Sequence, residues 1–248
     1  MNGKEILKAA TEVGFALLRY GAEINRVEES VIYICEAYGM KNVHVFAVHS
    51  TLFVSLTDEN EEYSTKIRRT FVSASDLDKV DRLNDLSRTI CKDKPDPETV
   101  MKALKEIEEK PSYPQWVMWL AGFLAGFAFC LFFKGSFWDA LCAGVIGFLL
   151  EILLFLLDKL ESNGFIRAAF GAIFCTAMSH LVVFLGLAGD AAVVNIGALM
   201  LLVPGLALTI SMRDFLASDY ISGIAKLAEA LMTAVCIAIG VVLVNMIL

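Results

Sequence analysis

The chain has 248 residues, of which 57% are hydrophobic, and its formal net charge is −7. Soluble domains have roughly 45–50% apolar residues, so part of this chain is predicted to lie in a lipid bilayer. Its acidic charge, with no basic stripe that carries interleaved aromatic residues, excludes a nucleic-acid-binding protein.

Charged residues divide the chain in two. Sixteen of the 21 Lys and Arg residues and 20 of the 28 Asp and Glu residues precede Pro114. Residues 1–112 are therefore predicted to be a water-facing domain, and residues 113–248 a transmembrane domain. The first residues show no apolar core followed by a cleavage site, so no removable signal peptide is expected.

The first domain is predicted to be a small α+β domain with the element order ααβββαα. Apolar residues recur at helical spacing in residues 4–20 and again in residues 24–38. Residues 42–57 and 63–71 are rich in Val, Phe and Thr, which favours two or three antiparallel strands. Two further amphipathic helices complete a domain of about 110 residues, enough for one modest core.

The second half contains five apolar runs, each long enough to cross a hydrocarbon core that needs about 20 helical residues. Small residues on the first two runs, such as Gly122 and Gly126, let helices approach closely and predict a compact bundle or a partner interface. The five predicted transmembrane helices are residues 116–133, 137–157, 166–187, 191–210 and 221–248.

The loop charges predict how these spans are oriented. A cytoplasmic N-terminus places four loop cations inside and one outside, which fits the tendency of Lys and Arg to stay on the cytoplasmic side. An odd number of spans then puts the C-terminus outside. The inside cations are Lys159, Arg167, Arg213 and Lys226, and the outside one is Lys134.

A proline interrupts the fourth run. Pro204 lacks a backbone donor and clashes with the preceding turn, so Pro204-Gly205 is predicted to kink or break the helix. A broken helix exposes amides and a positive dipole end that can hold a carboxylate at membrane depth. Two interpretations of the break are possible. It forms a substrate site, or it is a kink whose free backbone groups are satisfied by neighbouring helices. The candidate substrate-pathway residues are Asn195, Pro204, Gly205, Thr209, Ser211, Arg213 and Asp214.

Four ionisable residues in the spans are candidates for ion coupling. Glu151 and His180 cost roughly 2.5–3.5 kcal/mol each in a span, which calls for a reason such as a polar pathway. The alternatives are that Glu151 lies near the cytoplasmic end and that His180 bonds a neighbouring carbonyl. Lys226 and Glu229 are the other two candidates, although at i, i+3 spacing they are also compatible with a structural pair.

The water-facing domain carries a dense polar cluster at the start of its second helix, formed by Gly21, Glu23, Arg26 and Glu28. A solvated helix face is the alternative interpretation. His49-Ser50 lacks the context of a serine hydrolase, and the Walker, Rossmann, EF-hand and HExxH patterns are absent. No CxxC pair suggests zinc. The sequence therefore predicts no enzyme, no cofactor and no metal site.

Three stretches resemble the threonine/serine exporter family, specifically its short form. They are LLRYGAEINRVEESV from Leu17, TKIRR from Thr65, and NIGALMLLVPGLALTISMRDFLASDYISG from Asn195. The resemblance implies an inner-membrane exporter with a cytoplasmic N-terminal domain. It marks Gly21, Glu23, Arg26 and Glu28 in that domain, and Asn195, Pro204, Gly205, Arg213, Asp214, Ser222 and Gly223 in the membrane half.

Long members of the family carry a second apolar block, whereas this chain resembles only the first half of the fused exporters. We therefore expect a separate, small integral-membrane partner subunit and a hetero-oligomer. The leading hypothesis is a subunit of a secondary exporter that moves carboxylate-bearing metabolites such as threonine and serine outward. A dicarboxylate exporter, with a succinate-like cargo, is the alternative. An alternative of another class is a membrane-anchored metabolite sensor or hydrolase.

Overall fold

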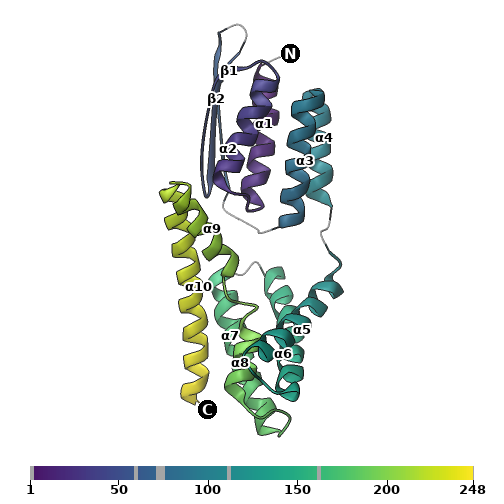
Figure 1. The fold of residues 1–248 in the computed structure, drawn as a ribbon, viewed down its shortest axis with the longest axis vertical. Coiled ribbons are helices and arrows are strands. Elements are labelled where there is room, and N and C mark those ends of the chain that lie inside the picture. Colours follow the sequence, from purple (N-terminus) through teal and green to yellow (C-terminus); the bar gives the residue numbers. More distant parts are fainter. Residues whose placement is uncertain (1–2, 59–60, 71–75, 111–112, 161–162, 248) are drawn as a thin grey trace. The chain divides into compact units, whose positions relative to one another are not determined.

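A computed structural model describes residues 3–58, 61–70, 76–110, 113–160 and 163–247 (Figure 1). The chain forms two compact units. The N-terminal unit comprises Met1–Ser112 and Ile210–Lys226, and the membrane unit comprises Tyr113–Thr209 and Leu227–Leu248. Phe71 and Leu248, the predicted ends of a strand and of the last span, lie outside the described residues.

The N-terminal unit begins with the predicted element order. Two helices, three strands and two helices follow one another in the chain. They are α1 (Gly3–Arg19), α2 (Ile24–Ala37), β1 (Lys41–Val48), β2 (Thr51–Thr57), β3 (Tyr63–Arg69), α3 (Leu77–Asp93) and α4 (Pro97–Glu109). The strands form one antiparallel sheet in the order β1-β2-β3.

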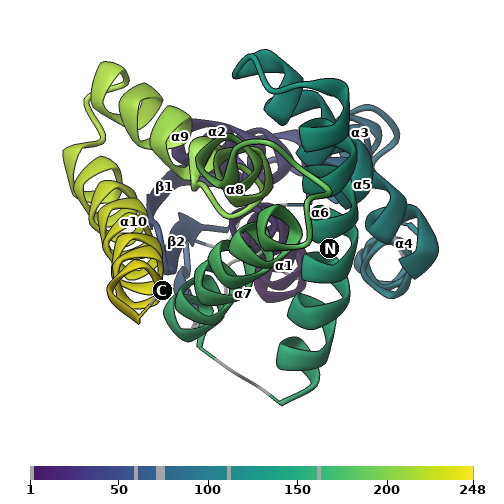
Figure 2. The ribbon, with the colours of Figure 1, turned by 90° about the horizontal axis from the view of Figure 1, so that it is seen from below.

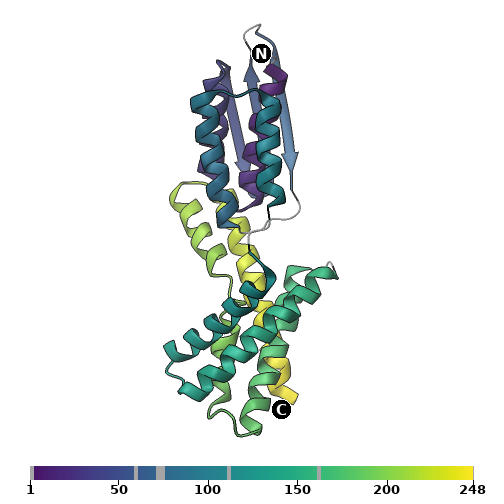
Figure 3. The same ribbon diagram turned by 90° about the vertical axis from the view of Figure 1, so that its right-hand side faces the viewer.

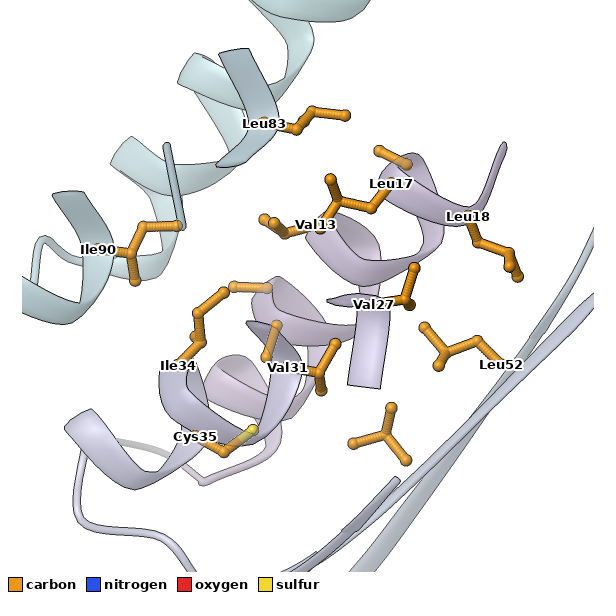
Figure 4. Packing of buried hydrophobic residues seen from close by; sticks show 14 of the residues in the cluster. Val13, Leu17, Leu18, Val27, Val31, Ile34, Cys35, Leu52, Leu83 and Ile90 are labelled. Carbon is orange, nitrogen blue, oxygen red and sulfur yellow. The ribbon is translucent and has the colours of Figure 1, made fainter. Parts of the chain in front are cut away.

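These elements form three layers, with α1 and α2 between the sheet and the α3–α4 pair (Figures 1 and 3). Alternate residues of β2 face the helices and are fully buried, because successive side chains of a strand point to opposite faces. Figure 4 shows the resulting core, where Leu52 of β2 lies beside the inner helices and Leu83 of α3 faces them from the other side.

Two ion pairs and a cation–π contact join β3 to α1. The Glu12 carboxylate lies 2.9 Å from Lys66 Nζ and 3.0 Å from Arg68 Nη2. The Arg68 guanidinium also lies over the Phe15 ring, 4.5 Å from its centroid.

The turn between α1 and α2 depends on Gly21. Its φ of +88° is a left-handed conformation that suits glycine. The Gly21 amide donates to the Leu18 carbonyl and the Ala22 amide to the Leu17 carbonyl, which is the pattern of a Schellman cap. This cap ends α1 and leaves Glu23 at the N-cap position of α2.

The remaining helices are α5 (Gln115–Phe132), α6 (Phe137–Lys159), α7 (Gly164–Phe184), α8 (Ala191–Leu199), α9 (Gly205–Leu216) and α10 (Tyr220–Ile247). Among the described residues, four helices are long and apolar enough to cross a membrane: α5, α6, α7 and α10. The predicted fourth span, residues 191–210, instead forms α8 and the start of α9, so a fifth crossing stays a prediction.

Helices α5 and α6 lie side by side in the membrane unit, with α7 and α8 packed against α6 (Figure 2). Glycines set the close approach of α5 to α6. A Cβ at Gly126 would lie 2.6 Å from the Ala143 carbonyl oxygen, and a Cβ at Gly147 would lie 2.4 Å from the Gly122 carbonyl oxygen. The small-residue faces predicted for the first two spans therefore do pack against each other.

Candidate functional site

The helix break lies between α8 and α9. Helix α8 ends at Leu199, Leu202 closes a turn by donating to the Leu199 carbonyl at 2.9 Å, and α9 begins at Gly205 directly after Pro204. The predicted break is confirmed. A Cβ at Gly205 would meet no atom within 4 Å, so packing does not require glycine at this position.

A cavity of about 450 Å³ lies beside the break within the membrane unit. Leu201 and Leu202 line it from the broken stretch, Glu151 and Asp158 from α6, and Arg167 from α7. Glu151 and Asp158 are seven residues apart, so two helical turns place both carboxylates on one face of α6. The cavity therefore combines apolar walls with three charged side chains.

The three charges differ in their pairing. Arg167 forms an ion pair with Asp158. In the part of the chain that the structure describes, the Glu151 carboxylate has no hydrogen-bond or ion-pair partner, and its stem packs against Gly122 of α5. Glu151 is thus the carboxylate in this cavity that is open to a ligand.

Other predicted residues of the membrane half bond elsewhere and do not line this cavity. Asn195 is buried and donates from Nδ2 to the Thr176 hydroxyl at 3.2 Å. The Thr209 hydroxyl donates to the Leu206 carbonyl of its own helix at 2.9 Å. His180 Nε2 lies 2.8 Å from Asn245 Oδ1, which links α7 to α10.

A second set of predicted residues gathers in the N-terminal unit, on the hairpin formed by the end of α9 and the start of α10. Ser218 turns the chain with a left-handed φ of +68°, and the Asp219 amide donates to the Asp214 carbonyl at 2.8 Å. Gly223 lets the two helices meet, since a Cβ there would lie 3.1 Å from the Phe215 ring. Arg213, on this hairpin, pairs with Glu23 at the α1–α2 turn.

Asp214 is the buried charge of this hairpin. It is 2% exposed, and among the described atoms its Oδ2 has no hydrogen-bond partner. Burial raises the pKa of Asp214, and the positive charge of Lys226, itself 7% exposed, acts in the opposite direction. Ser211 and Ser222 are buried on the same two helices.

Glu28 of α2 lies close enough to this cluster for the charge of Asp219 to act on it. Its Oε1 accepts a hydrogen bond of 2.7 Å from the Ala47 amide of β1. Burial raises the pKa of Glu28, the hydrogen bond from the Ala47 amide acts in the opposite direction, and the negative charge of Asp219 raises it again, so that the pKa lies above its ordinary value. Arg26, predicted with Glu28, instead lines a separate pocket between α2 and α3. Glu229 is exposed on α10, in the membrane unit.

Sequence reasoning missed some of these neighbours. Asp158 joins Glu151 in the cavity, and the seven-residue spacing on one predicted helix is a signal that reveals the pair. Asp219 and His49 influence Asp214 by charge, and nothing in their local sequence indicates it. Within the described ranges, no three His, Cys, Asp or Glu side chains are arranged to bind a metal ion.

Comparison with known proteins gives two matches. The profile of a family described as "Putative threonine/serine exporter" matches residues 8–248. A protein of Mycobacterium tuberculosis named "Probable threonine/serine exporter" is 23% identical over 247 residues, which cover 98% of this chain and 46% of that protein. The chain therefore spans about half the length of this relative. No solved structure matches the chain.

Proposed function

Because this chain belongs to the threonine/serine exporter family, we propose that it is one subunit of a secondary exporter that moves small amino acids such as threonine and serine out of the cell. The observation that supports this proposal best is the broken helix beside the charged cavity of about 450 Å³. In transporters, interrupted helices place amides and carbonyls where a polar substrate needs partners inside the bilayer.

The charges of the cavity favour an amino acid over a dicarboxylate. Two carboxylates and one guanidinium line it. A zwitterion can offer its ammonium group to Glu151 and its carboxylate to Arg167. A succinate-like dianion meets an excess of negative charge there, so this alternative cargo is the less favoured one.

We call the residues on the α9–α10 hairpin the hairpin cluster: Ser211, Arg213, Asp214, Ser222 and Lys226. This cluster is the proposed entry for substrate from the cytoplasm. Arg213 is exposed and paired with Glu23. Exposed ion pairs contribute roughly 0–1 kcal/mol, so this pair can open at little cost and present the guanidinium to an incoming carboxylate. Asp214 and Lys226, both buried nearby, are the groups we propose for proton or ion coupling, together with Glu151.

The proposed assembly lies in the inner membrane with the N-terminus in the cytoplasm and the C-terminus outside. This orientation requires α8, the break and the start of α9 to cross the membrane together once. The chain covers 46% of its relative, and we propose that a small integral-membrane subunit supplies the remainder.

Efflux from loaded cells tests the proposal. Cells that produce this chain with its partner subunit are loaded with labelled threonine or succinate, and efflux is followed for native protein, Glu151→Gln and Arg167→Gln. We expect threonine efflux to fall about tenfold or more in both variants, because each removes a charged partner of the substrate. Threonine is expected to leave faster than succinate.

Lys134→Gln is the matched control for Arg167→Gln. It removes a cation from the exposed α5–α6 turn, outside the cavity, and is expected to export at the native rate. Membrane levels of each variant are compared by immunoblot. Native threonine efflux in both cavity variants, at equal protein levels, would contradict the proposed pathway.

A further inference from the structure

Helices α2 and α3 present matching polar faces to one pocket in the N-terminal unit. Arg26, Glu29, Ser30 and Tyr33 have the spacing i, i+3, i+4 and i+7 on α2, which places them on one face. Asn84, Ser87, Arg88 and Lys92 share one face of α3 in the same way. The pocket between them has a volume of about 460 Å³, within the usual range for small-molecule sites.

The charge of this pocket is opposite to that of the protein. Three cations, Arg26, Arg88 and Lys92, line it with a single carboxylate, Glu29, whereas the whole chain has a net charge of −7. A local excess of positive charge attracts anions, even on a protein whose net charge is negative.

The cations are largely available for a ligand. Among the described residues, Arg26 and Lys92 have no ion-pair partner. Arg88 lies 3.8 Å from Asp85, and both side chains are exposed by 70% or more, so solvent screens this pair. Three unneutralised or weakly paired cations repel one another, and this repulsion falls when an anion binds among them.

Neutral groups complete the pocket. The Ser87 hydroxyl donates to the Asn84 carbonyl at 2.8 Å, which orients the wall of α3. Ser30, in the middle of α2, is buried. The Tyr33 ring, 58% exposed, forms one rim. Guanidinium groups at two positions suit phosphate or carboxylate oxygens, which they bind in a bidentate manner.

We propose that this pocket is a binding site for a small soluble polyanion that carries phosphate or several carboxylate groups. The proposal is independent of the transport pathway, since none of its lining residues belongs to the cavity or to the hairpin cluster.

Calorimetric titration of the full chain in a neutral detergent tests this proposal, with inorganic phosphate, pyrophosphate and citrate as probes. We expect at least one probe to bind with a Kd of about 1 mM or below. Arg88→Gln and Lys92→Gln are each expected to weaken that binding about tenfold, because each removes a charge-assisted contact. Arg82→Gln, on α3 but outside the pocket, is the matched control and should bind as the native chain does.

A gain of affinity provides the second test. Glu29→Gln removes the single carboxylate of the pocket and should strengthen binding several-fold, a result that misfolding cannot produce. Glu36→Gln, exposed on the same helix and outside the pocket, should leave the Kd unchanged. Absence of binding by all three probes, or equal affinities in pocket and control variants, would overturn the proposal.

Discussion

Glu28 and Glu29 are neighbours in the chain with different environments. Helical geometry turns Glu28 toward β1, where it accepts a bond from the Ala47 amide, and leaves Glu29 exposed on the face that meets α3. Composition and charge patterning cannot separate two adjacent glutamates, because their difference depends on what packs against each side of the helix.

Replacing Glu28 tests this contact. Glu28→Ala leaves the Ala47 amide buried without an acceptor, and Ala47 is only 3% exposed. We expect this change to destabilise the protein by about 1–3 kcal/mol. Glu29→Ala is expected to change stability by less than about 0.5 kcal/mol. Thermal unfolding of both full-length variants in detergent measures the difference, and equal unfolding temperatures would exclude a structural role for the Glu28 bond.

Asp214 gives the stability of the protein a dependence on pH. Burial raises its pKa above the ordinary value, so the folded state binds the proton more tightly than the unfolded state does. Its contribution to stability is therefore largest at low pH and is lost as pH rises through the folded pKa. The Asp214→Asn variant cannot titrate at this position. Glu28 titrates in both proteins, so its contribution cancels in the difference between their unfolding temperatures.

The unfolding temperature of native protein minus that of Asp214→Asn is therefore expected to increase as pH falls from about 7 to about 4.5. Scanning calorimetry or fluorescence at a series of pH values measures it. A difference that stays constant, or that shrinks on acidification, is incompatible with a carboxyl group whose pKa is raised by burial.

At the scale of elements, the contact between α5 and α6 depends on glycines whose added Cβ would overlap backbone. In Gly147→Ala the new methyl group would lie 2.4 Å from the Gly122 carbonyl oxygen, and backbone cannot move aside as a side chain can. We expect the free energy of unfolding to fall by about 1–3 kcal/mol, which is measured as a lower unfolding temperature in detergent.

Gly205→Ala is the control for this prediction, since its Cβ would meet no atom within 4 Å. It should unfold at the native temperature or slightly above. Equal destabilisation by both substitutions would show that glycine is needed for the backbone and not for the close approach of α5 to α6.

Local patterns were sufficient to predict most elements. Hydrophobic periodicity predicts the helices and strands of residues 3–110, and run length predicts α5, α6, α7 and α10. The break at Pro204 follows from its missing donor. What the patterns do not reveal is that α8 already ends at Leu199, before Pro204, because an apolar composition alone does not fix where a helix ends.

The candidate site was less predictable, because it depends on contacts between distant residues. Glu23 and Arg213 are 190 residues apart, and neither periodicity nor spacing brings them together. Asp214 and Lys226 lie on different helices, and their proximity follows from the left-handed turn at Ser218. Glu151 could be identified from the sequence, because a charged side chain in an apolar run is costly whichever residues surround it.

At the scale of the whole molecule, the proposed orientation predicts which turns face outside. In a variant without its six cysteines, single cysteines replace Lys134, Asn163, Gly186 or Ser218, one in each of four turns. A membrane-impermeant maleimide added to intact cells should label positions 134 and 186 and should not label 163 and 218 until the cells are opened. Labelling at 218 from outside would show that α8 and α9 do not cross together.

The N-terminal unit is built from two separate stretches, Met1–Ser112 and Ile210–Lys226, and this has a consequence for biosynthesis. The ribosome completes the first stretch while the second is still unmade, and the intervening chain enters the bilayer in the meantime. The Glu23–Arg213 pair and the environment of Asp214 therefore form only after most of the membrane unit has been inserted. The Glu23–Arg213 pair would report that synthesis has passed α9, and the full environment of Asp214 that it has reached Lys226 of α10.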